Sequence, residues 1–174
     1  MNLKSSDVVL SIAASGRTPY CIGALKKARS VGAGCISLAC NRNAVISQFA
    51  DVAIEVDAGP EVLTGSTRLK AGTCQKLILN MISTTSMVGV GKVFGNYMVD
   101  MKATNEKLKN RARRIVMATT HCEEQDAEQA LQDAGNSIKT AIVMRMTGMP
   151  RTEAEEALQR EHGYVRRCIQ HEEG

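Results

Sequence analysis

Two clusters of hydroxyl-bearing and cationic residues have the composition of an anion-binding site. The first is Ser15, Gly16, Arg17 and Thr18 in the stretch "IAASGRTPY", which follows the apolar run "DVVLS" and precedes a helical pattern. A glycine lets the backbone approach an anion closely, while two hydroxyls and the free N–H groups of a helix start can donate hydrogen bonds to it. Arg17 adds charge or faces water. The alternative is that Ser15 and Thr18 only cap the helix, and local sequence does not choose between the two.

The second cluster is Ser66, Thr67, Arg68 and Lys70, at the beginning of a long apolar helix that we expect near residues 69–91. It again combines hydroxyls, cations and the N–H groups of a helix start. Both clusters follow strands that we expect in one parallel sheet, so they should converge on one edge of that sheet. These features favour a phosphate-bearing small molecule as the ligand.

Other kinds of site find little support. The sequence has neither GxGxxG in the first turn nor GxxxxGK[ST], which argues against a dinucleotide and a nucleoside triphosphate. The histidines, His121, His162 and His171, all fall in the helical C-terminal part, where we expect them on the surface. The six cysteines are scattered without a CxxC pair or a histidine at zinc spacing, so we expect reduced, mostly buried thiols.

The elements that must position these clusters alternate between strands and helices. Residues 7–14, "CISLAC" and "VAIEVDA" are apolar strand-like runs, and a helix is predicted from Pro19 to the glycine-rich "SVGAG". Uniformly apolar strands separated by helices are typical of a parallel sheet covered on both faces, so the fold class is α/β. The long helix is apolar around most of its circumference, which predicts packing against another subunit and a homo-oligomer.

The C-terminal part is helical from about Thr104 and repeats itself. "AEQALQ" at residues 127–132 recurs as "AEEALQ" at residues 154–159, and the same offset aligns Ile138 with Val165 and Ile142 with Ile169. Two copies of a small helical hairpin are the natural interpretation, and chance similarity of two amphipathic helices is the alternative.

The composition, with 44% apolar and 23% charged residues and a net charge of +4, is that of an ordinary globular protein. The sequence has no apolar run long enough for a membrane span and no leader-like start, so we expect a cytoplasmic location and no membrane partner. The basic stretch "KLKNRARR" (107–114) lies on an amphipathic helix pattern, and aromatic residues make up only 3% of the chain. A solvated helix face is therefore favoured over a nucleic-acid interface.

Several motifs resemble those of one family. "SIAASGRTPY" resembles the sugar-phosphate-binding turn of sugar isomerase (SIS) domains, in which SGxT follows a strand. "GPEVLTGSTRLKAGTCQK" and "KVFGNYMVDMKATNEKL" are similar to the signature shared by N-acetylmuramic acid 6-phosphate etherases and the glucokinase regulatory protein. "GMPRTEAEEALQREHGYVRRCI" resembles the UBA-like helical end of the bacterial etherases. The resemblance runs from Leu3 to about Gln170.

This resemblance implies a fold and an activity. The fold is the C-terminal half of a SIS-type parallel three-layer sandwich over residues 1–103, followed by a small all-helical, UBA-like region over residues 104–174. The activity is cleavage of the lactyl ether of N-acetylmuramic acid 6-phosphate to N-acetylglucosamine 6-phosphate and D-lactate, in recycling of cell-wall amino sugar. The reaction eliminates lactate and then adds water, and the resemblance implies no cofactor. A homodimer is expected.

The resemblance also implies roles for individual residues. Ser15, Gly16 and Thr18 match the phosphate-binding turn, and Ser66 and Thr67 match the hydroxyl pair of the second loop. The signature further includes Glu61, Arg68 and Lys70 as candidate substrate contacts. For Glu61 the alternative is that it caps its own loop.

The family's first strands, first phosphate-facing turn and candidate catalytic carboxylates are expected upstream of Met1. No catalytic residue is therefore predicted in this chain, and its activity on its own is in question. The alternatives to an etherase are a non-catalytic sugar-phosphate-binding regulatory module and an inactive fragment. An unpaired strand edge at the missing part predicts association or poor solubility.

Overall fold

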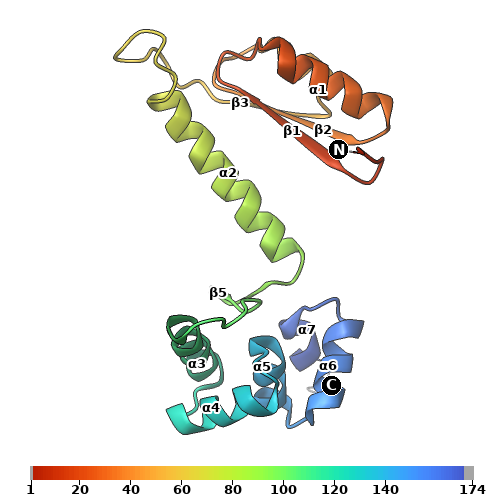
Figure 1. The fold of residues 1–174 in the computed structure, drawn as a ribbon, viewed down its shortest axis with the longest axis vertical. Coiled ribbons are helices and arrows are strands. Elements are labelled where there is room, and N and C mark those ends of the chain that lie inside the picture. The colour runs from red at the N-terminus through yellow and green to blue at the C-terminus, as the bar shows by residue number, and fades with distance from the viewer. Residues whose placement is uncertain (1, 171–174) are drawn as a thin grey trace. The chain divides into compact units, whose positions relative to one another are not determined.

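The computed structural model describes residues 2–170, which form two compact units (Figure 1). The first unit is Met1–Ile82 and the second is Ser83–Gly174, so the long helix α2 (Lys70–Gly89) begins in one and ends in the other. Each unit has its own buried cluster of apolar side chains. The predicted domain boundary between residues 103 and 104 stays a prediction.

The first unit is a three-stranded parallel sheet with the crossover helix that the sequence predicts. β1 (Val8–Ala13) is followed by α1 (Pro19–Ser30), β2 (Gly34–Ala39), the short 3-10 helix η1 (Val45–Phe49) and β3 (Val52–Glu55). The strand order is β1-β2-β3, with Val9 opposite Cys35 and Ile36 opposite Val52. Because the strands are parallel, all three carboxyl ends lie at one edge of the sheet.

Helical cover lies on one face of this sheet. Alternate strand residues such as Ala13, Cys35 and Ala39 pack with α1 and η1 into a buried cluster. On the opposite face the side chains of Val8, Ile12 and Val52 are 63%, 36% and 54% exposed. The parallel sheet and its flanking helix are confirmed, whereas cover on both faces and the three-layer sandwich stay predictions.

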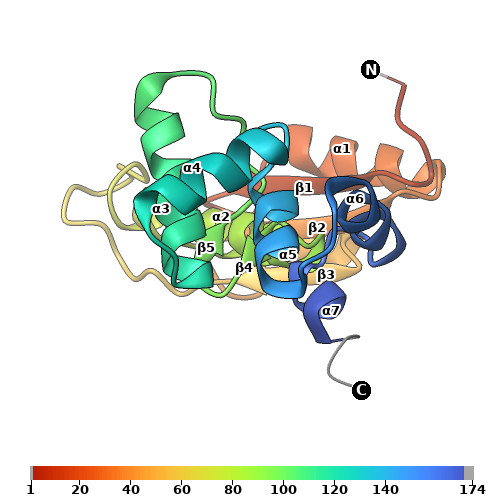
Figure 2. The same cartoon turned by 90° about the horizontal axis from the view of Figure 1, so that it is seen from below.

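The second unit is mainly helical. A hairpin of β4 (Val93–Phe94) and β5 (Tyr97–Met98) precedes α3 (Glu106–Thr120), α4 (Glu124–Asp133), α5 (Ile138–Thr147), α6 (Arg151–Arg160) and α7 (Val165–Gln170). Both views place α5 between the pair α3, α4 and the pair α6, α7 (Figures 1 and 2). The hairpin was not predicted, because strands of two residues are too short to show an alternating pattern.

The internal repeat is confirmed as two copies of one helix–turn–helix. In the first copy the Asn136 amide donates to the Leu131 carbonyl at 2.7 Å, and in the second the Gly163 amide donates to the Leu158 carbonyl at 2.7 Å. Asn136 and Gly163 occupy the same repeat position and both have positive φ, 65° and 82°. The same sequence spacing thus makes the same turn twice, while the UBA-like label stays a prediction.

Candidate functional site

The first predicted turn joins the end of β1 to α1 and is tightly packed. Its Gly16 has φ +67°, and its amide donates to the Ala13 carbonyl at 2.9 Å. A Cβ atom on Gly16 would lie 2.4 Å from the Ala44 Cβ and 3.2 Å from the Ala39 Cβ. Only glycine therefore fits here, for both its backbone conformation and its lack of a side chain.

The hydroxyls of this turn are not used to cap α1 in the usual way. Thr18 is the N-cap residue, yet its side chain makes no capping hydrogen bond. The Ser15 hydroxyl accepts from the Arg17 amide at a long 3.4 Å. Ser15, Arg17 and Thr18 are exposed, and the first amides of α1 have no acceptor within the helix. The capping interpretation is wrong for Thr18, and these donors are open to a ligand.

The second predicted loop is organised by Glu61. Its Oε2 accepts from the Lys70 amide at 2.9 Å and its Oε1 accepts from the Ala71 amide at 3.0 Å. The amides of Ala71 and Lys70 hold the pKa of the Glu61 carboxyl below its usual range. Glu61 thus closes its own loop, as the alternative interpretation of the sequence predicts, and it does so by capping the N-terminus of α2. Contact with a ligand stays a prediction.

Among the remaining residues of the second loop, Thr67 and Arg68 are exposed and Ser66 is half-buried. The Ser66 amide donates to the Leu63 carbonyl and the Gly72 amide to the Thr67 carbonyl, each at 2.9 Å, so the backbone winds directly into α2. Within residues 2–170 the side chains of Ser66, Thr67 and Arg68 make no hydrogen bond or ion pair. Lys70 differs, because its Nζ donates to the Ala58 carbonyl at 3.2 Å.

The end of β2 contacts both loops. The Cys40 amide and the Asn41 Nδ2 each donate to the Ala14 carbonyl at 3.0 Å, directly before the first turn. The Cys40 thiol donates to the carbonyl of Ala71, in the first turn of α2, at 3.5 Å. Figure 1 likewise shows the loop before α2, in yellow, leaving the sheet at the end where α1 begins. The expected convergence of the two clusters on one sheet edge is confirmed, and their role in binding stays a prediction.

Two polar residues at this edge were missed from the sequence. Asn41 ties β2 to the first turn, and Glu55, the last residue of β3, accepts hydrogen bonds from the segment that follows β2. A polar residue that directly ends an apolar strand was the signal that would have pointed to either of them.

Comparison with protein families gives two matches. Residues 1–84 match the SIS domain, and residues 95–138 match the C-terminal lid domain of glucokinase regulatory protein. The first match contains the whole converging edge, with both predicted clusters.

Curated relatives match almost the whole chain. Proteins named N-acetylmuramic acid 6-phosphate etherase from Geobacillus thermodenitrificans, Oenococcus oeni and Halalkalibacterium halodurans are 55%, 55% and 56% identical over 98%, 96% and 97% of it. This chain belongs to the N-acetylmuramic acid 6-phosphate etherase family. It spans 58%, 56% and 57% of the lengths of these three relatives.

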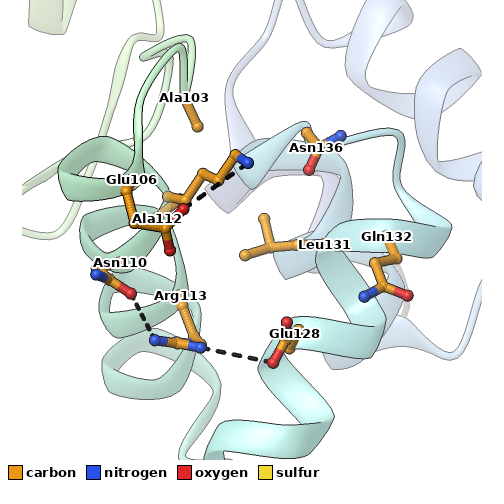
Figure 3. A pocket seen from close by; sticks show the side chains of 10 residues that line it. Ala103, Glu106, Asn110, Ala112, Arg113, Glu128, Leu131, Gln132 and Asn136 are labelled. Atoms are coloured by element: carbon orange, nitrogen blue, oxygen red, sulfur yellow. Dashed lines mark hydrogen bonds and ion pairs between the residues drawn. The ribbon is translucent and has the colours of Figure 1, made fainter.

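In this etherase-family chain the segment that matches the lid domain contains a hollow of about 280 Å³ between α3 and α4 (Figure 3). The charged side chains that line it already bind one another or Asn110. Arg113 donates to Asn110 and pairs with Glu128 at 3.5 Å, and Lys109 lies 3.9 Å from Glu106. We therefore assign no ligand to the hollow.

The etherase-family chain shows no metal cluster within its described residues, 2–170. His121 and His162 are exposed and have φ of 53° and 52° in turns that follow α3 and α6, while His171 and Met1 lie outside the described residues. All six cysteines are free thiols, and burial raises the pKa of the Cys40 and Cys168 thiols.

In the basic stretch (107–114), Lys107, Arg111 and Arg114 are exposed, as predicted for a solvated helix face. None of the helices of the described chain has the length and hydropathy needed to cross a bilayer.

Proposed function

We propose that this chain forms part of the sugar-phosphate site of an N-acetylmuramic acid 6-phosphate etherase. Such an enzyme is a carbon–oxygen lyase that releases D-lactate and N-acetylglucosamine 6-phosphate in recycling of cell-wall amino sugar. The observation that carries the proposal is the meeting of two loops at one sheet edge, in a chain of this family, where the Thr18, Ser66 and Thr67 hydroxyls make no hydrogen bond within the described residues.

In this proposal the phosphate lies at the start of α1. Ser15 and Thr18 donate through their hydroxyls, the turn at Gly16 brings backbone amides close, and Arg17 supplies positive charge. From the second loop, Ser66, Thr67 and Arg68 contact the rest of the ligand. Lys70 and Glu61 hold this loop in place through the hydrogen bonds already described.

We place no catalytic base in this chain. Elimination of lactate needs a carboxylate that takes the proton next to the sugar's carbonyl carbon. Glu55 and Glu61 are two carboxylates whose hydrogen bonds organise this edge, and those bonds lower the pKa of both groups. A carboxylate stabilised in its charged form is a poor proton acceptor, so both suit a structural role.

A non-catalytic sugar-phosphate-binding module is the second candidate, and the match of residues 95–138 to the lid domain of glucokinase regulatory protein favours it. Turnover of the substrate by this chain would exclude the non-catalytic module. The experiment incubates the folded 174-residue chain with N-acetylmuramic acid 6-phosphate, assays D-lactate, and titrates N-acetylglucosamine 6-phosphate by calorimetry. Saturable binding without lactate release is the expected result, because we place no catalytic base in this chain. Lactate release would exclude the non-catalytic module and would show that this chain does contain a base. If the chain is folded by circular dichroism but shows neither binding nor lactate release, both candidate functions are contradicted.

Substitution of Ser15 by alanine should weaken binding of N-acetylglucosamine 6-phosphate. The loss of one hydrogen bond to a charged group costs about 1–2 kcal/mol, which is roughly a 5- to 30-fold increase in Kd. Calorimetric titration of the Ser15→Ala variant measures this increase in Kd. Ser30→Ala, at the opposite end of α1, removes a hydroxyl that donates to the Lys27 carbonyl and has no other partner within residues 2–170, so it should leave Kd unchanged. Equal affinities of the two variants would remove Ser15 from the site.

We also propose that the chain self-associates, as a homodimer. Leu77 and Met81 lie one turn apart on α2 with large exposed fractions, and Val8 and Val52 are exposed on the open sheet face. Sizing chromatography with light scattering should give at least twice the chain mass of 18.8 kDa. A single sharp monomer peak would contradict this proposal.

A further inference from the structure

The carboxylate of Glu55 organises the segment that follows β2. Its Oε2 accepts from the Asn43 amide at 2.8 Å, and its Oε1 accepts from the Ala44 amide at 2.9 Å. The Ser47 hydroxyl also donates to Oε1, at 2.6 Å. Two consecutive amides aimed at one carboxylate form an internal anion site, and Asn43 has the positive φ of 54° common in such turns. The donors hold the pKa of the Glu55 carboxyl below its usual range, with Ser47 contributing most.

The segment that Glu55 holds in turn braces the first turn. The Ile46 amide donates to the Gly16 carbonyl at 3.0 Å, while the Gly16 amide closes the turn by donating to the Ala13 carbonyl. Ala44 lies directly against Gly16, at a distance that leaves no room for a side chain. Residues 44 and 46 therefore fix the position of Gly16 from outside its own loop, and Glu55 fixes residues 43, 44 and 47.

We propose that Glu55 is a positioning residue for the phosphate-binding turn, an inference that rests on the proposed sugar-phosphate site. Glu55 does not contact the ligand. It acts through Asn43, Ala44 and Ser47 on Gly16, and so sets the direction of the amides and hydroxyls at the start of α1. A turn that is fixed before the ligand arrives loses less conformational entropy on binding.

A general loss of stability is the competing explanation for any effect of Glu55, and Asp51 supplies the matched control. Asp51 precedes the other end of β3, where its Oδ2 accepts from the Cys35 amide at 2.8 Å and its Oδ1 pairs with Arg29 at 3.3 Å. Both carboxylates accept backbone amides, Asp51 from β2 and Glu55 from the segment after β2, and their hydrogen bonds lower the pKa of both groups. Only Glu55 lies at the edge with the candidate site.

The experiment compares the full chain with Glu55→Gln and Asp51→Asn by calorimetric titration of N-acetylglucosamine 6-phosphate, at a temperature where circular dichroism shows every variant folded. We expect Glu55→Gln to raise Kd by about fivefold or more, because its amide group cannot accept all of these bonds. Asp51→Asn should change Kd by less than about twofold. In amide NMR spectra without ligand, the signals of Gly16 and Ile46 should move in Glu55→Gln and not in Asp51→Asn.

Ser47→Ala provides a milder variant if Glu55→Gln does not fold. It removes one donor to the same carboxylate and should produce a smaller rise in Kd with the same NMR changes. Absence of binding by the unsubstituted chain would contradict the proposed function. If Glu55→Gln binds as tightly as the unsubstituted chain, the positioning role is overturned and the proposed function stands. If Glu55→Gln is unfolded, intact binding by Ser47→Ala overturns the positioning role in the same way. An equal loss of affinity in Asp51→Asn would also overturn it.

Discussion

Replacement of Gly16 by alanine should abolish measurable binding of N-acetylglucosamine 6-phosphate and destabilise the protein. The new methyl group would lie 2.4 Å from the Ala44 Cβ, and the residue would keep a left-handed backbone at φ +67°. Backbone strain and overpacking together cost about 2–4 kcal/mol. Ala44 cannot move away easily, because its amide is bound to Glu55. Denaturant unfolding measures the change in stability, and calorimetry measures the affinity.

Gly23→Ala is the matched control for this prediction. Gly23 lies within α1, and a Cβ atom there would meet no atom within 4 Å. The substitution should therefore raise stability by about 0.5–1 kcal/mol and leave Kd unchanged. If Gly16→Ala instead bound the sugar phosphate as tightly as the unsubstituted chain, the turn would not be the phosphate site.

Replacement of Glu61 by alanine should raise the Kd for N-acetylglucosamine 6-phosphate by about 30-fold or more. The carboxylate accepts the amides of Lys70 and Ala71, and its removal frees the first turn of α2 together with the loop that carries Ser66, Thr67 and Arg68. Several ligand contacts are then lost at once, each hydrogen bond to a charged group being worth about tenfold. Glu61→Gln, which keeps one acceptor oxygen, should lie between the two in calorimetric titrations. Equal affinity of all three proteins would contradict the role of the cap.

The same substitution predicts a pH dependence of stability. The folded-state pKa of Glu61 is lowered, so the ionised carboxylate stabilises the fold above the unfolded-state pKa of about 4.3, and this stabilisation is lost as the pH falls through the folded-state value. The difference in Tm between the unsubstituted chain and Glu61→Ala should be present at pH 7 and shrink progressively below about pH 4. A difference that stayed constant down to pH 3 would rule out the ionised cap.

Local sequence patterns predicted the elements of both units because they depend on neighbouring residues. Apolar runs and glycine-rich stops gave β1, α1, β2 and β3 close to their observed bounds, and the recurring "AEQALQ" pattern gave the repeated helical hairpin. Ser15, Gly16 and Thr18 were recognisable from their order along the chain after a strand. The family was recognisable for the same reason, since its signatures are continuous stretches.

The roles of the carboxylates were decided only by the tertiary structure. From the sequence, Glu61 in a signature loop could contact a ligand or cap its own loop, and only the tertiary structure places the amides of residues 70 and 71 against its two oxygens. The position of Glu55 at the end of a strand does not reveal its role, because it acts on Gly16 through residues that come from a different loop. The need for glycine at position 16 likewise arises from Ala44, which is distant in sequence and close in space. Hydroxyls and glycines in sequence order thus establish what the turn can bind, and packing between distant loops decides how it is held.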